Sequence, residues 1–355
     1  MFGKLLQHSF RIFILSAKSQ ARSSARVRRY GKMSKPTIYL TRKLNSAAMK
    51  RLEEQCVVEL WEGPDPVPRE TLLSNIANKK GLCCLLTDRI DQEVLDAGTD
   101  LKVISTMSVG FDHLDLPAIR AKNIRIGYTP GVLKDATAEL TMCLILATGR
   151  RLMEASKEAA TGGWSSWSPF WMCGMGLLGK TVGVVGAGAV GSEVMRRVKP
   201  FRPKDLLYVN RTPRPDLEEE LGAKQVELDE LLATSDYVVA CTSLNSDTQE
   251  MFNEEAFSKM KKTAIFVNSA RGGVVDQDAL IKALENETIG AAGLDVTTPE
   301  PLPLSSPLFK MKNCVILPHI GSATYTTRYA MAMLAVENLI CGLKGEEMPE
   351  ELKAK

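Results

Sequence analysis

Short runs of β-branched and other apolar residues alternate with stretches of helical periodicity from residue 36 onward. In the first half of the chain the apolar runs are TIYLT, VVELW, LCCLLT, LKVISTM and IRIGYT, at residues 37–41, 57–61, 82–87, 101–107 and 124–129. Helical patterns lie between them, near residues 46–55, 69–79, 91–98 and 115–122. Strands that alternate with helices in this way predict a parallel sheet with helices on both faces.

A second series of the same kind follows a long helical pattern. Apolar residues at helical spacing, Leu140, Cys143, Leu144 and Ala147, predict one helix over residues 135–153. Six more strands are predicted at residues 181–186, 206–210, 237–243, 264–270, 291–296 and 314–318, and a final helix at residues 322–343. Two such series predict an α/β protein with two doubly wound, Rossmann-like domains, each with a parallel sheet.

The first 35 residues differ in composition from the rest. They contain nine Lys and Arg residues, no Asp or Glu, and many Ser. This leader resembles a mitochondrial transit peptide, whereas Arg11 interrupts the apolar core that a secretory signal needs. The alternative is a disordered or untranslated extension, with translation starting at Met33. We exclude residues 1–33 from the fold, and expect the mitochondrial matrix if they act as a transit peptide and the cytosol for the form starting near Met33.

Charge and cysteine spacing exclude several classes of partner and site. Without the leader, 45 − 9 = 36 basic residues face 42 acidic ones, a net charge of −6, which argues against nucleic acid as a partner. No apolar run approaches the ~18 residues that span a membrane, so no membrane partner is expected. The eight cysteines form no CxxC pair, which indicates reduced, mostly buried thiols and no metal site.

The pattern GxGxxG occurs twice, and context separates the two. Residues 174–179 have no strand before them and lie in a stretch rich in Trp and Gly, which predicts a loop. Gly186, Gly188 and Gly191 follow the apolar run TVGVV and open a helical pattern at residues 189–198. There the first glycine permits a tight turn, the second a close approach of pyrophosphate, and the third close helix–strand packing. We predict a dinucleotide site at this turn.

The end of the next strand indicates which dinucleotide binds. NAD enzymes place Asp or Glu there to bind the ribose 2′-hydroxyl, whereas this strand ends Asn210-Arg211-Thr212-Pro213-Arg214. Because two arginines suit a 2′-phosphate and no carboxylate is present, we predict that NADP(H) is preferred, with NAD(H) as the second option. The alternative is that both arginines are solvated loop residues.

Charged groups follow three strands of the second series. Arg271 follows AIFVNSA, Asp295 and Glu300 follow AAGL, and His319 follows CVILP. Ligands of open α/β sheets bind beyond the carboxyl ends of the strands, where these residues would lie. Of the three histidines, His319 is a better proton donor candidate than His113 because it ends a strand of the predicted cofactor domain.

This set suits the reduction of a 2-oxo acid. Hydride would attack the carbonyl carbon while His319 donates a proton to the oxygen. Arg271 would bind the substrate carboxylate, and Glu300 would hold the other ring nitrogen of the histidine. The backbone amides of Val109 and Gly110 could form a carboxylate cradle. The alternative for Arg271, Glu300 and His319 is a surface ion-pair network. The alternative for the segment of Val109 and Gly110 is a plain turn.

Six motifs occur in the order found in one family: STMSVGFDHLDL, GYTPGVLKDATAEL, VGVVGAGAVG, NSARGGVVDQDAL, AAGLDVTTPEPLP and CVILPHIGSAT. The chain from residue 36 resembles the D-isomer-specific 2-hydroxyacid dehydrogenases, and within them the branch that reduces glyoxylate and hydroxypyruvate. The resemblance implies a cofactor domain, residues 134–319, inserted into a discontinuous flavodoxin-like substrate domain, residues 36–133 and 320–355.

The resemblance also implies roles for particular residues. The catalytic set would be Arg271, Glu300 and His319. Residues 162–180, GGWSSWSPFWMCGMGLLGK, hold three of the four tryptophans and are predicted to form a Trp-rich loop. Substrate contacts would come from Val109, Gly110, Arg271, Asp295, His319, Ser322 and, in this Trp-rich loop, Trp167. Cofactor contacts would come from Gly186, Gly188, Ala189, Val190, Gly191, Arg211, Thr212, Pro213, Arg214, Ser243, Ala270, Asp295 and Gly321. A homodimer is implied, in which the Trp-rich loop reaches toward the active site of the other subunit and the helix over residues 135–153 forms part of the contact.

Two alternatives remain open at the level of sequence. One is another 2-hydroxyacid dehydrogenase, such as a 3-phosphoglycerate or formate enzyme, although the phosphoglycerate branch often carries a long extension after the core. The other is a dinucleotide-sensing corepressor-like scaffold, which can keep the same Arg–Glu–His set. Such a scaffold should bind NAD(H) through an acid at the end of the second strand, and that acid is missing here.

Overall fold

The computed structural model describes residues 34–353, and they contain two parallel sheets. The predictions on residues 1–33 fall outside this range. The first sheet has the order β2-β1-β3-β4-β5. Its strands are β1 (Thr37–Leu40), β2 (Val57–Leu60), β3 (Gly81–Cys84), β4 (Val103–Thr106) and β5 (Arg125–Gly127). The five strands predicted in the first half of the chain are confirmed.

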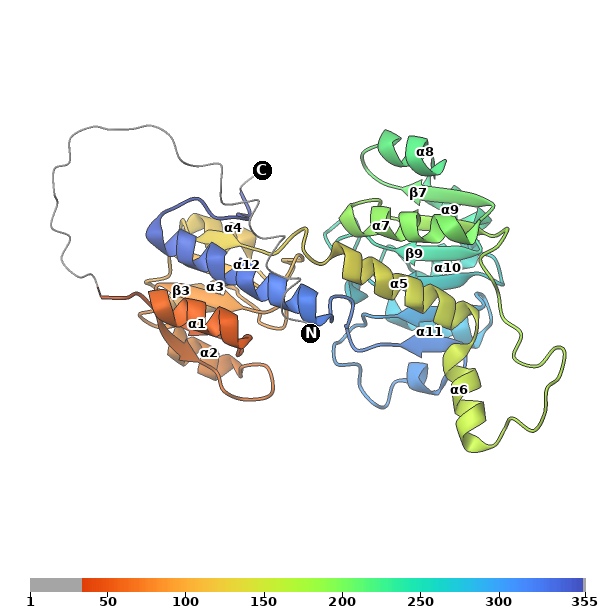
Figure 1. Cartoon of the computed structure of the whole chain (residues 1–355), viewed down its shortest axis with the longest axis horizontal. Coiled ribbons are helices and arrows are strands. Elements are labelled where there is room, and N and C mark those ends of the chain that lie inside the picture. Colours follow the sequence, from red (N-terminus) through yellow and green to blue (C-terminus); the bar gives the residue numbers. More distant parts are fainter. Residues whose placement is uncertain (1–33, 354–355) are drawn as a thin grey trace, which may run out of the picture. The chain divides into compact units, whose positions relative to one another are not determined.

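Helices cover both faces of this sheet because alternate side chains of its strands are buried on opposite sides. Ile38 and Leu40 pack against α1 (Ser46–Gln55) and α12 (Tyr325–Lys344). Tyr39 packs on the opposite face, which is covered by α2 (Arg69–Ile76), α3 (Gln92–Ala97) and α4 (Leu116–Ala121). The last helix of the chain therefore lies beside the first one (Figure 1).

Polar contacts fix the return of α12 to the first sheet. The hydroxyl of Ser105 donates to the carbonyl oxygen of Ala335 at 2.7 Å. The amide of Asn338, fully buried, donates to the carbonyl oxygen of Tyr128 at 2.8 Å. These bonds satisfy polar groups that would otherwise be buried without partners. The domain boundaries at residues 133/134 and 319/320 stay a prediction.

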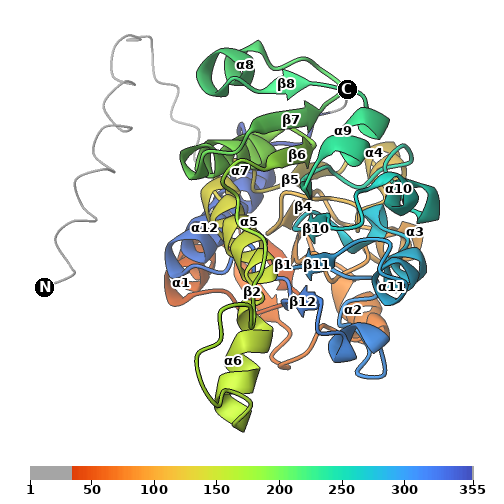
Figure 2. The same cartoon turned by 90° about the vertical axis from the view of Figure 1, so that its right-hand side faces the viewer.

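The second sheet has the order β12-β11-β10-β9-β6-β7-β8. Its strands are β6 (Thr181–Val185), β7 (Asp205–Val209), β8 (Lys224–Gln225), β9 (Tyr237–Ala240), β10 (Ile265–Asn268), β11 (Ala291–Leu294) and β12 (Cys314–Ile316). One face carries α5 (Lys134–Gly149), α7 (Ala189–Val198) and α8 (Pro215–Leu221). The other carries α9 (Leu228–Thr234), α10 (Glu254–Lys259) and α11 (Gln277–Glu285) (Figure 2). The prediction missed β8, because its two exposed residues have no apolar pattern.

The single helix predicted over residues 135–153 is wrong. Helix α5 ends at Gly149, and a separate helix α6 (Leu152–Thr161) begins after Arg151, which has left-handed backbone (φ 54°). The carbonyl oxygen of Gly149 accepts the N–H of Met175 at 2.7 Å. The last carbonyl group of α5 is therefore bonded to the following loop and not to a further helical turn. Cys143, placed on the predicted apolar face, is exposed.

Residues 162–180 form a loop without helix or strand, as predicted. Trp164, Trp167 and Phe170 are exposed in it, and the side chain of Trp167 is 82% exposed. Cys56, Cys83 and Cys84 are buried, and burial also raises the pKa of the thiols of Cys241 and Cys314 to about 12, whereas Cys143 and Cys173 are exposed, so the prediction of mostly buried thiols fails for the last two. None of the helices within residues 34–353 has the length and apolar character required to cross a membrane.

Candidate active site

The turn after β10 presents Arg271 at the carboxyl edge of the second sheet. Asn268, buried at the end of the strand, accepts the N–H of Ala270 at 3.0 Å and donates to the carbonyl oxygen of Arg271 at 2.8 Å. The two bonds fix the shape of the turn, so the local sequence determines the position at which the Arg271 side chain leaves the backbone.

The guanidinium of Arg271 lies against the loop that follows β4. Its Nε donates to Oδ1 of Asp112 at 3.0 Å, and its Nη1 donates to the carbonyl oxygen of Ala270 at 2.9 Å. A Cβ built on Gly110 would lie 1.8 Å from Nη2, so only glycine admits the guanidinium there. The structure thus brings together Arg271 and the predicted carboxylate cradle. Three of the five N–H donors of the guanidinium remain for a ligand.

Asp112 remains ionised beside this arginine. Partial burial acts to raise the pKa of its carboxyl, but the charge and hydrogen bond of Arg271 outweigh that effect, and the pKa is lowered. Asp112 was not among the site residues predicted from the sequence. The sequence feature that could have identified it is an acidic residue within the loop that follows β4 and precedes α4.

His319 and Glu300 form the second part of the site. Nδ1 of His319 lies 2.7 Å from Oε2 of Glu300, and the other oxygen of Glu300 accepts the N–H of Thr297 at 3.0 Å. With the Nδ1 proton held by the carboxylate, Nε2 is the ring nitrogen that can face a substrate. The predicted pairing of His319 with Glu300 is present in the structure.

Asp295 fixes the backbone that carries His319. Both carboxylate oxygens accept backbone N–H groups, from Ile320 and Gly321, each at 2.8 Å. The N–H of His319 donates to the carbonyl oxygen of Asp295 at 2.8 Å, and His319 has left-handed backbone (φ 53°). Burial raises the pKa of Asp295, against these hydrogen bonds. The substrate and cofactor contacts predicted for Asp295 stay a prediction.

The two parts of the site lie on neighbouring strands. β10, β11 and β12 are adjacent and parallel, so the segments after them emerge at one edge of the sheet, with about 5 Å between neighbouring strands. A Cβ built on Gly272 would lie 1.9 Å from the carbonyl oxygen of Thr297, the residue that Glu300 binds. The turn of Arg271 therefore packs directly on the segment that orients His319.

The surroundings of His113, the other candidate proton donor, do not suit a proton donor. Its Nε2 lies 2.9 Å from the hydroxyl of Thr106, and its Nδ1 is buried without a hydrogen-bond partner. Burial lowers the pKa of His113 to about 4, so the ring is neutral near neutral pH. The hydroxyl of Thr106 also contacts that of Ser108, which donates to the carbonyl oxygen of Gly110. This network supports the loop that faces Arg271.

The second GxGxxG motif has the geometry that a dinucleotide turn requires. Gly186 has φ 98° and would clash with the backbone of Thr242 if it carried a Cβ. A Cβ on Gly191 would lie 2.0 Å from the carbonyl oxygen of Gly186, so the first turn of α7 packs tightly on the turn after β6. A Cβ on Gly188 would meet nothing within 4 Å, which leaves space for a phosphate at the start of α7. The residues present therefore fit a bound dinucleotide.

The two arginines after β7 have different surroundings. Arg211 is exposed and has no hydrogen-bond or ion-pair partner within residues 34–353. Arg214 donates to both oxygens of Asp216, at 2.8 and 2.6 Å, and to the carbonyl oxygen of Ala187 and the hydroxyl of Ser192. The expectation of no carboxylate beside these arginines is wrong, because Asp216 binds Arg214. Arg211 is thus the arginine that is free to bind an added phosphate.

The remaining predicted contacts lie around these groups. Ala189 and Val190 begin α7, and Thr212 and Pro213 are exposed between the two arginines. Ser243 is exposed beyond the carboxyl end of β9, and Ser322 follows Gly321. No group of three or more His, Cys, Asp or Glu residues in the described part of the chain is placed to hold a metal ion.

Comparison with known proteins identifies the family. The model of the D-isomer specific 2-hydroxyacid dehydrogenase NAD-binding domain matches residues 142–321. A mouse protein named glyoxylate reductase/hydroxypyruvate reductase is 55% identical over 299 residues, which cover 84% of this chain and 91% of the relative. The chain belongs to the D-isomer-specific 2-hydroxyacid dehydrogenase family and binds a nicotinamide dinucleotide.

Solved structures agree in fold. The TT0316 protein from Thermus thermophilus has a TM-score of 0.84 and 43% identity, covering 89% of this chain and 100% of that one. An NADPH-dependent glyoxylate/hydroxypyruvate reductase from Sinorhizobium meliloti, in complex with NADP and malonate, has a TM-score of 0.78 and 29% identity, covering 90% of this chain and 97% of that one.

Proposed function

We propose that this chain reduces glyoxylate to glycolate and hydroxypyruvate to D-glycerate with NADPH. The observation that carries the proposal is the 2.7 Å pairing of His319 with Glu300 on the same sheet edge as Arg271. Relatives named for this activity, including the mouse protein, support the choice of substrates.

Each group in the site has a separate role in the proposed reaction. A nicotinamide dinucleotide held at the turn of Gly186, Gly188 and Gly191 would supply the hydride for the carbonyl carbon. Arg271, with the amides of Val109 and Gly110, binds the substrate carboxylate. His319 donates the Nε2 proton to the carbonyl oxygen as negative charge develops there. Glu300 holds Nδ1 of the ring, so that Nε2 is the nitrogen that faces the carbonyl oxygen.

NADP(H) is the proposed preferred cofactor, with NAD(H) as the second one. Arg211 supports this, because an exposed arginine without an internal partner can pair with a 2′-phosphate. The NADP held by the Sinorhizobium meliloti enzyme is consistent with the preference.

We also propose a homodimer in which the loop of residues 162–180 extends Trp167 toward the active site of the other subunit. The exposure of Trp167 and Phe170 supports this, since a contiguous exposed apolar segment is typical of a contact surface. The proposed location is the cytosol for the form starting near Met33, and the mitochondrial matrix if residues 1–33 act as a transit peptide.

A substrate panel tests the proposed function. Protein starting at Met33 is assayed for NADPH and NADH oxidation with glyoxylate, hydroxypyruvate and 3-phosphohydroxypyruvate, beside the variant Arg271→Ala. Steady turnover of glyoxylate and hydroxypyruvate, abolished in the variant, is expected. Tight cofactor binding without turnover of any 2-oxo acid would instead favour the scaffold.

A further inference from the structure

The loop after β4 contains two free backbone donors. The N–H groups of Val109 and Gly110 have no hydrogen-bond acceptor among residues 34–353, and both residues are partly exposed. In the proposed function these groups bind the substrate carboxylate together with Arg271, which lies against Gly110. Two N–H groups that must first be ordered bind an anion weakly, because their ordering costs conformational entropy. Whatever fixes this turn therefore affects how tightly the substrate binds.

The side chain of Ser108 holds the turn in one shape. Its hydroxyl donates to the carbonyl oxygen of Gly110 at 2.7 Å. The bond closes a ring that contains the two peptide groups to which the N–H groups of Val109 and Gly110 belong, so these peptide groups cannot rotate independently. Ser108 is 3% exposed, and water therefore does not compete for the bond.

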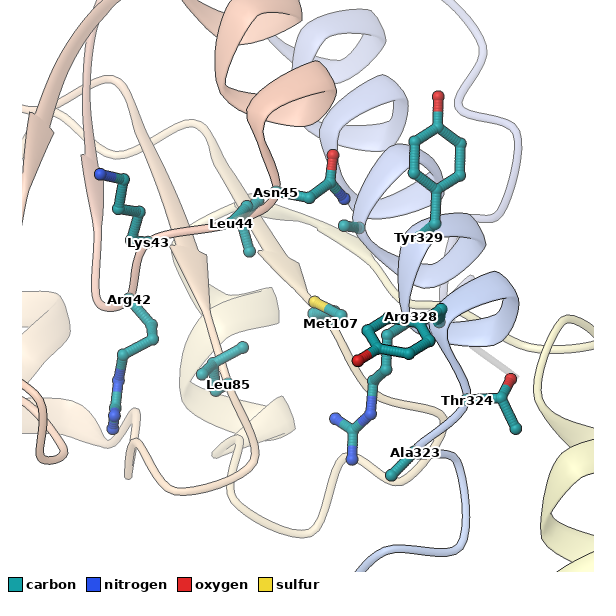
Figure 3. A pocket seen from close by; sticks show the side chains of 12 residues that line it. Arg42, Lys43, Leu44, Asn45, Leu85, Met107, Ala323, Thr324, Arg328 and Tyr329 are labelled. Carbon is teal, nitrogen blue, oxygen red and sulfur yellow. The ribbon is translucent and has the colours of Figure 1, made fainter. Parts of the chain in front are cut away.

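Thr106, the last residue of β4, lies on the same side as Ser108 and is fully buried. Side chains alternate between the two faces along a strand and its extension. Ser105 and Met107 accordingly lie on the other face, where the hydroxyl of Ser105 binds α12 and Met107 lines a cavity beside the start of that helix (Figure 3). The hydroxyl groups of Thr106 and Ser108 are separated from that cavity by the strand, so they take partners on their own face.

A count of protons gives the direction of each bond on this face. Each hydroxyl has one proton, and Ser108 uses its own for Gly110. In the 2.8 Å contact with Thr106, Ser108 is therefore the acceptor and Thr106 the donor. Thr106 must then accept in its 2.9 Å contact with Nε2 of His113. The thiol of Cys84, whose pKa is raised by burial, keeps its proton and can donate to the second lone pair of Thr106.

This count places the proton of His113 on Nε2 and leaves Nδ1 bare. Nδ1 is buried and has no hydrogen-bond partner in the described part of the chain, so a second proton there would be a buried donor without an acceptor. Burial lowers the pKa of His113 to about 4, which agrees with a ring that does not take the second proton near neutral pH. The donor at Nε2 is thus present throughout the neutral range.

We propose that His113, Thr106 and Ser108 position the amides that bind the substrate carboxylate. A neutral His113 with its proton on Nε2 starts a series of three hydrogen bonds that all run in one direction and end at the carbonyl oxygen of Gly110. The three side chains act through the turn of Gly110 and are positioning residues. The inference rests on the proposed function, because the amides of Val109 and Gly110 bind a substrate in that reaction.

Nitrogen NMR of the imidazole tests the direction of the series. Full-length protein labelled at the histidine nitrogens is used, and a long-range proton–nitrogen correlation spectrum distinguishes a protonated from a bare ring nitrogen. Near neutral pH, the signals of His113, identified by their loss in His113→Gln, should show a proton on Nε2 and none on Nδ1. A proton on Nδ1 with a bare Nε2 would overturn the assigned direction.

Steady-state kinetics test the positioning role. Thr106→Val and Ser108→Ala should raise KM for glyoxylate and for hydroxypyruvate by the same factor, about three- to tenfold, because both substrates carry the carboxylate. The values of kcat and of KM for NADPH should change less than about twofold. Thr106→Ser keeps the hydroxyl and His113→Gln keeps an N–H donor, so KM in these variants should stay within about twofold of the wild type. His113→Leu should resemble Thr106→Val.

Ser105→Ala is the matched control, because it removes a buried hydroxyl bond from the same strand on the opposite face. It should lower the thermal midpoint and leave KM unchanged. If folded Thr106→Val and Ser108→Ala have the same KM as Ser105→Ala, the positioning role is refuted. Absence of glyoxylate and hydroxypyruvate turnover in the wild type would refute the proposed function instead, and the NMR result would still decide the state of His113.

Discussion

The carboxylate of Asp112 binds Nε of Arg271 at 3.0 Å and so connects the loop after β4 to the turn after β10. Each residue follows a strand of a different sheet. The bond uses the inner nitrogen of the guanidinium and leaves Nη2 beside Gly110. Asp112 therefore acts as a positioning residue for the arginine that is proposed to bind the substrate carboxylate.

Replacing Asp112 by Asn should raise KM for glyoxylate and lower kcat/KM by about ten- to a hundredfold, with a smaller change in kcat. The physical reason is the loss of a charged hydrogen bond worth about 1.5–3 kcal/mol that orients Arg271. Steady-state kinetics of glyoxylate reduction measure KM and kcat of the variant. Asp115→Asn is the matched control, since Asp115 only caps α4 and Asn caps equally well. A purely structural role for Asp112 would instead lower the thermal midpoint and leave KM unchanged in the folded fraction.

His319→Gln should reduce turnover in both directions by about a hundred- to ten-thousandfold, because a general acid–base group is lost. In the wild type, reduction needs the protonated ring and oxidation the neutral one. The rate of reduction should therefore fall toward high pH and the rate of oxidation toward low pH. Identical pH profiles in both directions would contradict the role of His319.

Arg211→Ala should raise KM for NADPH by about ten- to a hundredfold and leave KM for NADH nearly unchanged. Arg214→Ala should instead weaken both cofactors, because Arg214 binds the carbonyl oxygen of Ala187 within the glycine-rich turn. The double variant should show both effects. Equal loss of the two cofactors in Arg211→Ala would refute the 2′-phosphate contact.

The neutral His113 makes stability depend on pH. Its pKa falls from 6.5 to about 4 on folding, so the unfolded chain binds this proton more readily between those values. The free energy of unfolding is therefore highest above pH 6.5. It decreases by up to about 3 kcal/mol as the pH falls to about 4. Urea unfolding across this range should show a smaller pH dependence for His113→Gln than for the wild type. An equal pH dependence in wild type and His113→Gln would exclude the effect.

Much of the fold could be predicted from the local sequence. The five strands of the first series and the six predicted in the second occur near their predicted positions, because β-branched runs buried on both faces have few other solutions. The order of strands along the chain also places Arg271, Glu300 and His319 at one edge, since parallel strands share a carboxyl end. The glycines at 186, 188 and 191 could be assigned because each position has a distinct steric requirement.

The sequence by itself determined the alternation of elements, the glycine-rich turn and the strand ends that carry the Arg, Glu and His side chains. Tertiary structure alone decided where α5 ends, because a bond from Met175 takes the carbonyl oxygen of Gly149. It also decided that Asp216 binds Arg214 while Arg211 stays free, and that Asp112 reaches Arg271 from 159 residues away. Such contacts depend on how separate elements pack, and residue type and spacing do not encode that packing locally.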